Sequence, residues 1–215
     1  MKEIRTLTSR YTEAKELRIM MAGQIFAGTS SYINTIDSAL QGHLSSRALA
    51  GVDEHRVTKK FNPFRVEDRA NGEGDGFLPF VIYDNMGIDR DVDSPDDYIS
   101  AVKGHIKDGY KFNPIRPLRD GSPYFNKNPT VNDVAHCLVY VVAAHRLRTM
   151  DDHVLKFLKH IRSNVSDIDI PQIVLVTKVD AGCPLVEKDL KKVYRSRYIK
   201  QQVSLHLAAV GFKIK

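Results

Sequence analysis

The sequence predicts an α/β domain with a doubly wound, mostly parallel sheet and helices on both of its faces. Four short apolar runs, rich in valine, isoleucine and leucine, alternate along the chain with amphipathic stretches. Runs without polar alternation are typical of strands that are buried on both faces. The 215 residues, 42% of them hydrophobic, suffice for one domain with a substantial core.

The apolar runs indicate the strands, and the amphipathic stretches indicate the helices. Strands are predicted at 17–23, 78–84, 137–144 and 172–180, and helices at 31–42, 94–107, 150–164 and 186–202. The glycine-rich stretch 71–76 predicts a hairpin loop between antiparallel strands. The proline-rich stretch 110–130 predicts an irregular surface insertion, and long insertions are more often functional than decorative.

The composition indicates a cellular compartment and a class of binding partner. The net charge of +6 favours an anionic partner, and a nucleotide, a nucleic acid or an anionic membrane surface all fit it. Cys137 and Cys183 lie far apart and form no CxxC pair, so we expect the reducing cytoplasm and neither a disulfide framework nor a zinc site. We also expect no secretory signal and no membrane-spanning segment.

The stretch from Gly23 to Ser31, GQIFAGTSS, nearly matches the phosphate-binding P-loop pattern G-x-x-x-x-G-K-[ST]. Gly23 and Gly28 have the required spacing between a predicted strand and a predicted helix. Ser30 stands at the position of the magnesium-binding hydroxyl, but Thr29 occupies the lysine position. On its own, the stretch also fits an ordinary strand-to-helix turn that Ser30 or Thr29 caps.

Two further motifs each follow a predicted strand directly. In DNMG, Asp84 is positioned to hold magnesium through water, and Gly87 to offer its N–H to a γ-phosphate. In TKVD, Thr177, Lys178 and Asp180 match the [NT]-K-x-D motif, whose aspartate accepts two N–H bonds from guanine that adenine cannot supply. Open α/β sheets bind ligands at the carboxyl ends of their strands, so the three motifs together predict a guanine-nucleotide site.

Several longer segments carry a more specific resemblance: SALQGHLSSRALAG, LPFVIYDNMGI, GHIKDGYKFNPI, AHCLVYVV and PQIVLVTKVDAGCPLVEKDLKKVYRSRYI. With these segments the chain resembles the guanine-nucleotide-binding domain of the interferon-induced protein 44 and 44-like family, over residues 17–211. The resemblance implies a Ras-like P-loop fold, a cytoplasmic protein, and a role in the interferon, antiviral and immune response. It also implies GTP or GDP with Mg²⁺ as the cofactor.

The chain departs from that family at the P-loop and at its C-terminal end. A lysine at the position of Thr29 would bridge the β- and γ-phosphates, and its loss removes a contact of roughly 1.5–3 kcal/mol, about ten- to a hundredfold in affinity. Ala27 stands where we expect a glycine. We also expect an N-terminal extension at 1–15 and an incomplete Ras-like domain at 16–215, which lacks the last strand and helix of such a domain.

The predicted site therefore combines three separate segments of the chain. No catalytic residue is predicted, because no glutamine follows DNMG to position a water molecule. Thr58 is the threonine nearest to the expected first switch, and it is a candidate magnesium ligand together with Ser30 and Asp84. The predicted nucleotide-binding residues are Gly23, Ala27, Gly28, Thr29, Ser30, Ser31, Asp84, Gly87, Thr177, Lys178 and Asp180.

Two other classes of function stay open. The chain would be a pseudo-GTPase if it kept only the scaffold and acted through protein partners. It would be an RNA-binding protein if the basic segment 187–202 contacted nucleic acid. We expect instead that this segment is one amphipathic helix with a solvated cationic face and no nucleic-acid partner. Its apolar stripe would consist of Leu190, Val193, Tyr194 and Tyr198.

Overall fold

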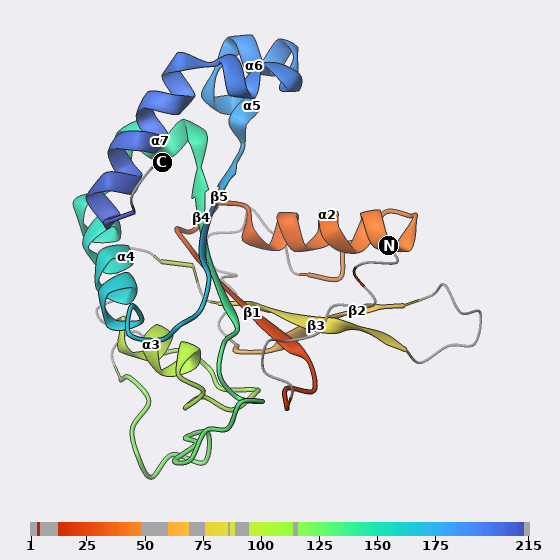
Figure 1. Ribbon diagram of the computed structural model, residues 1–215, viewed down its shortest axis with the longest axis vertical. Helices are drawn as coiled ribbons and strands as arrows, with labels where there is room; N and C mark the ends of the chain where they lie inside the picture. Colours follow the sequence, from red (N-terminus) through yellow and green to blue (C-terminus); the bar gives the residue numbers. More distant parts are fainter. Residues whose placement is uncertain are drawn as a thin grey trace.

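The computed structural model describes Ile4 and residues 13–48, 60–68, 76–85, 87–88, 95–113 and 116–212. Within these residues, five strands form one sheet in the order β2-β3-β1-β4-β5. Figure 1 shows the sheet between α2 on one side and α3, α4 and α7 on the other. The predicted α/β class with a mostly parallel sheet is therefore confirmed.

The central strand is β1 (Leu17–Gly23), which pairs in parallel with both of its neighbours. These neighbours are β3 (Phe77–Asp84) and β4 (Cys137–Ala143), and β5 (Gln172–Thr177) continues the parallel sheet beyond β4. Only β2 (Pro63–Glu67) is antiparallel, to β3, as predicted for the strands on either side of the glycine-rich stretch. Because the other four strands run the same way, their carboxyl ends lie at one edge of the sheet.

The helices are divided between the two faces of the sheet. One face carries α2 (Thr29–Gln41), and the opposite face carries α3 (Asp96–Val102), α4 (Asp152–Asn164) and α7 (Arg197–Val210) (Figure 1). Among the described residues, no helix is both long and apolar enough to cross a bilayer. The predicted absence of a last strand and helix beyond residue 211 stays a prediction.

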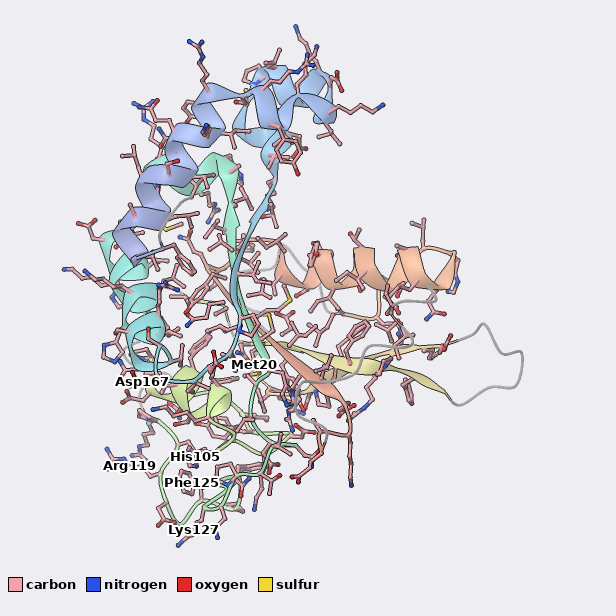
Figure 2. The ribbon with its side chains drawn as sticks, viewed as in Figure 1. Met20, His105, Arg119, Phe125, Lys127 and Asp167 are labelled. Atoms are coloured by element: carbon pink, nitrogen blue, oxygen red, sulfur yellow. The ribbon has the colours of Figure 1, made fainter. Side chains whose placement is uncertain are left out.

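The core consists of two main clusters, one on each face of the sheet. Met21 of β1 belongs to the cluster that α2 closes with Ile33. Its neighbour Met20, near the middle of the domain in Figure 2, belongs to the cluster that α3 and α4 close with Tyr98 and Phe157. Because consecutive residues of β1 are buried on opposite faces, its stretch from Ile19 to Ala22 is apolar without interruption.

The single helix predicted at 186–202 is wrong. The chain forms three pieces there, namely α6 (Pro184–Lys188), the 3₁₀ helix η3 (Leu190–Arg195) and α7. The side chains of Asp189 and Ser196 each accept a hydrogen bond from a backbone N–H two or three residues further on. Each bond caps the start of a new helix, so the helical pattern of the sequence is interrupted twice.

The proline-rich stretch 110–130 contains no regular helix or strand among its described residues, as predicted. It is nevertheless tied to the domain. The buried carboxylate of Asp97 accepts a hydrogen bond from the Tyr110 hydroxyl at 2.7 Å and another from a backbone N–H of the stretch. The rings of His105 and Phe125 stack with their centroids 5.5 Å apart (Figure 2).

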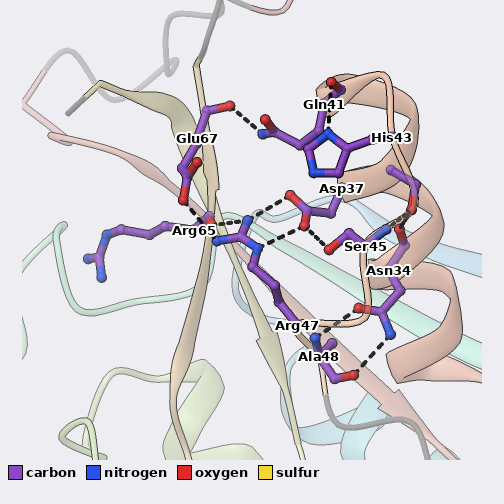
Figure 3. A network of polar contacts seen from close by, with 10 residues as sticks. Asn34, Asp37, Gln41, His43, Ser45, Arg47, Ala48, Arg65 and Glu67 are labelled. Atoms are coloured by element: carbon purple, nitrogen blue, oxygen red, sulfur yellow. Dashed lines mark hydrogen bonds and ion pairs between the residues drawn. The ribbon is translucent and has the colours of Figure 1, made fainter. Parts of the chain in front are cut away.

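An ion pair between the buried Asp37 and the half-exposed Arg47 joins α2 to the segment that follows it (Figure 3). The fully buried Asp37 carboxylate accepts hydrogen bonds from the Arg47 guanidinium at 2.9 and 2.7 Å, and a further one from the Ser45 hydroxyl. Burial alone would raise the pKa of Asp37, but these donors outweigh it and lower that pKa. Glu67 of β2 lies 3.5 Å from the same guanidinium, so the network also reaches the edge of the sheet.

Replacing Asp37 by asparagine should destabilise the fold by about 1–3 kcal/mol, because the Arg47 guanidinium would lose a buried, charged acceptor. The matched control is Glu67→Gln, which changes a half-exposed partner of the same guanidinium and should cost less than about 0.5–1 kcal/mol. The urea midpoints of the two variants at neutral pH measure the difference. Equal losses of stability in both variants would contradict the role given to the buried Asp37 carboxylate.

Candidate functional site

The P-loop stretch leaves the carboxyl end of β1 through a position that admits no side chain. A Cβ on Gly23 would lie 2.7 Å from the backbone oxygen of Val141 on the neighbouring strand. Gly28 has a φ of +91°, in the left-handed region that glycine adopts without strain. Both glycines of the motif are therefore required by the backbone path itself.

The residue in the stretch that adopts a glycine-like conformation is Phe26 and not Ala27, which stands where the family pattern has a glycine. Phe26 has a φ of 64°, whereas Ala27 lies outside the left-handed region and is buried at 1% exposure. A side chain in the left-handed region costs roughly 1–2 kcal/mol. The stretch therefore holds its turn under strain at Phe26.

The first turn of α2 faces the end of the sheet without a side-chain cap. Its N-cap residue is Gly28, no side chain of the turn caps the N-terminus, and no acidic residue lies in the first turn. The alternative of a turn capped by Thr29 or Ser30 is therefore not observed. The uncapped N–H groups and the positive end of the helix dipole suit an anion such as phosphate.

The hydroxyl of Ser30 donates a hydrogen bond to the carboxylate of Asp84 at the end of β3. Burial raises the pKa of Asp84 to about 6, and the bond from Ser30 only partly opposes this effect. A hydroxyl and a carboxylate are oxygen ligands that suit Mg²⁺, which takes its remaining ligands from phosphates and water. The described residues contain no group of three or more His, Cys, Asp or Glu side chains that could hold a metal alone.

The DNMG motif lies directly against the P-loop stretch. A Cβ on Gly87 would come within 2.7 Å of the Ile25 side chain, so the close approach requires a glycine. Ile88 donates its N–H to the Gly23 oxygen at 2.8 Å and accepts the N–H of Ile25 at 3.1 Å. The Ile25 N–H is thus bonded to protein and does not point freely into the loop. Thr58 lies outside the described residues.

The TKVD motif contacts the same stretch from the other side. Lys178 donates a hydrogen bond from Nζ to the Phe26 oxygen at 2.9 Å, and the Thr177 hydroxyl donates one to the Ala27 oxygen. The carboxylate-bearing Asp180 is exposed at the start of the short helix α5 (Val179–Gly182). The structure therefore brings the three predicted motifs together at one edge of the sheet.

Two basic residues at this edge were missed by the sequence analysis. Arg146, in the 3₁₀ helix η2 (Ala144–Thr149) after β4, lies with Nη1 3.5 Å from the Ile25 oxygen and with its guanidinium 5.6 Å from the centre of the Phe26 ring. Burial lowers the pKa of the neighbouring His145, and the charges of Lys178 and Arg146 lower it further. No motif marks these residues, because Arg146 meets the loop, and His145 the charge of Lys178, only in the folded chain.

No family model matches the chain. It is 25% identical over 213 residues to interferon-induced protein 44 of Homo sapiens, an alignment that covers 98% of the chain and 47% of that protein. The corresponding Mus musculus protein is 25% identical over 201 residues, covering 93% of the chain and 47% of that protein. Interferon-induced protein 44-like of Homo sapiens is 28% identical over 191 residues, or 87% of the chain and 42% of that protein.

The chain is a homologue of the interferon-induced protein 44 and 44-like proteins. The family resemblance predicted from the sequence segments is therefore confirmed. The chain spans about half the length of the curated relatives that it matches.

Replacing Asp84 by asparagine should stabilise the protein at neutral pH, because it removes a buried carboxylate. The folded pKa of about 6 lies above the ordinary value of 3.8, so the folded state loses stability as the pH rises from about 4 to about 6. The expected loss is roughly 1–3 kcal/mol. Asp84→Asn should abolish this pH dependence and raise the urea midpoint at pH 7.

The control for that experiment is Asp180→Asn, at an exposed carboxylate that follows β5. This variant should change the stability by less than about 0.5 kcal/mol at any pH between 4 and 7. If Asp84→Asn left the slope of stability against pH unchanged, burial of that carboxylate would not be the cause of the slope.

Proposed function

We propose that this chain is a guanine-nucleotide-binding protein of the interferon and innate immune response, and that it acts in the cytoplasm. In this proposal it binds GTP or GDP with Mg²⁺ weakly, and it hydrolyses GTP at no useful rate. The observation that carries the proposal is the meeting of three motifs at one sheet edge, where Ser30 contacts Asp84 and Lys178 contacts Phe26. The interferon response is proposed from the names of the relatives.

Each motif has a distinct task in the proposed complex. The uncapped first turn of α2, from Gly28 to Ser31, binds the phosphates through backbone N–H groups. Ser30 and Asp84 hold Mg²⁺, which neutralises phosphate charge. The exposed carboxylate of Asp180 accepts the two guanine N–H groups, and Lys178 supports both the base and the loop.

Three features of the loop support weak binding. Thr29 leaves the phosphates without the cation that a loop lysine supplies. The turn is strained at Phe26, and the Ile25 N–H is bonded to Ile88. Because negative charge increases on the same phosphate oxygens during hydrolysis, the missing cation should impair catalysis more than binding.

Titration of fluorescently labelled GDP and GTP with Mg²⁺ tests this function. Thr29→Lys should tighten binding about ten- to a hundredfold, since it restores one charge-assisted contact to the phosphates. Adding Asp180→Asn to that variant should remove the preference for guanine over adenine nucleotides. Thr29→Ala is the matched control, and it should leave the affinity close to that of the wild type.

The alternative is a pseudo-GTPase that uses the scaffold for protein contacts alone. It is supported if neither the wild type nor Thr29→Lys shows saturable binding at millimolar nucleotide. That result would contradict the proposed nucleotide site.

A further inference from the structure

The segment from α6 through the first turn of α7 exposes an unusual set of large side chains. Four residues of this segment are exposed although they are aromatic or aliphatic: Leu185 at 46%, Leu190 at 61%, Tyr194 at 96% and Tyr198 at 41%. The sequence pattern predicts that Leu190, Tyr194 and Tyr198 pack in the apolar stripe of one helix. Because α6, η3 and α7 are separate, that stripe does not form.

These exposed side chains are not needed for the local core. A small cluster of Cys183, Val186 and Ile199 closes the inner side of the segment, with Val193 packed against it. The Ser196 side chain is buried there as well, where its hydroxyl caps α7. The segment therefore folds on its own small core and leaves its tyrosines in solvent.

Exposed cations flank the exposed tyrosines along the chain. Five exposed cationic residues have no ion-pair partner among the residues that the structure describes, and Lys192 is paired with Asp189 at 3.8 Å. Glu187 is the other acidic residue of the segment, so positive charge dominates this surface. The five cations are Lys188, Lys191, Arg195, Arg197 and Lys200.

We propose that the surface formed by residues 185–200 binds single-stranded nucleic acid, with the cations on the phosphates and Tyr194 as a stacking platform for a base. A ring that is 96% exposed leaves its faces open to a base, and stacking on tyrosine tolerates any base sequence. The unpaired cations can neutralise backbone phosphates, which every nucleic acid carries whatever its base sequence. The reason for expecting no nucleic-acid partner, a packed tyrosine stripe, no longer holds.

A nucleic acid fits this surface better than a lipid bilayer does. Binding in the plane of a membrane requires a continuous helix with one apolar face. Here the exposed groups come from two short helices and the first turn of α7, and the segment is broken at Asp189 and Ser196. Figure 1 shows α6 at the far end of the domain from α3, where a flexible strand of nucleic acid can approach it. The surface lies outside the proposed nucleotide-binding residues, so this proposal does not depend on them.

The test is the fluorescence anisotropy of a labelled 20-nucleotide oligouridine titrated with the full chain at several salt concentrations. Tyr194→Ala should weaken binding about five- to a hundredfold, whereas Tyr194→Phe should retain it, because phenylalanine keeps the stacking ring. The control Tyr124→Ala changes another exposed tyrosine and should have no effect. Circular dichroism checks that each variant stays folded.

The contribution of the cations is measured separately, from the dependence of the affinity on salt concentration. Replacing both Arg195 and Arg197 by glutamine should reduce the slope of log affinity against log salt by about 1.4, which is two phosphate contacts on a single strand. The matched pair Lys156→Gln and Lys159→Gln, at exposed positions on α4, should leave the slope unchanged.

Three results would overturn the proposal. The first is no saturable binding of the oligonucleotide at 20 mM salt. The second is an equal loss of affinity in the control variants and in the surface variants. The third is a protein that binds vesicles containing 30% phosphatidylserine but does not bind the oligonucleotide. If Tyr194→Ala also lost the vesicle binding, the surface would be assigned to a lipid headgroup layer.

Discussion

The candidate site depends on the close contact between the end of β1 and the backbone of β4. Gly23 is the last residue of the central strand, and a Cβ there would lie 2.7 Å from the Val141 oxygen. β1 ends at this residue, and the loop that follows begins at the edge where its parallel neighbours β3 and β4 also end. The contacts of Ile25, Phe26 and Ala27 with the other motifs all follow from that path.

The site also contains a carboxylate, that of Asp84, whose negative charge is unfavourable in its buried position. Asp84 is held in a buried position that raises its pKa to about 6, although a polar neighbour, Ser30, donates to it. A buried carboxylate beside a hydroxyl costs stability in the free protein and recovers it when a cation binds. The strained Phe26 adds a second local cost at the same edge. Residues that lower the stability of the free protein in this way are commonest at binding and catalytic sites.

Four strands and the three motifs could be predicted because each is a local feature of the sequence. Continuous apolar runs indicate parallel strands, and the motifs follow them directly. The break at Asp189 and Ser196 could not be predicted, since a helical period continues through both residues and the caps form only in the folded chain. Arg146 was missed for a similar reason, because it meets Ile25 across the fold and no motif contains it.

Hydrogen exchange of the backbone amides, with and without GDP and Mg²⁺ at millimolar concentration, tests the central claim most directly. If the three motifs form one nucleotide site, the ligand should slow exchange together in segments 24–31, 84–88 and 177–180, and Mg²⁺ alone should not reproduce the effect in the last segment. The five strands of the sheet should change little, because they are already paired. Unchanged exchange in all three segments, or protection in one of them alone, would contradict the account.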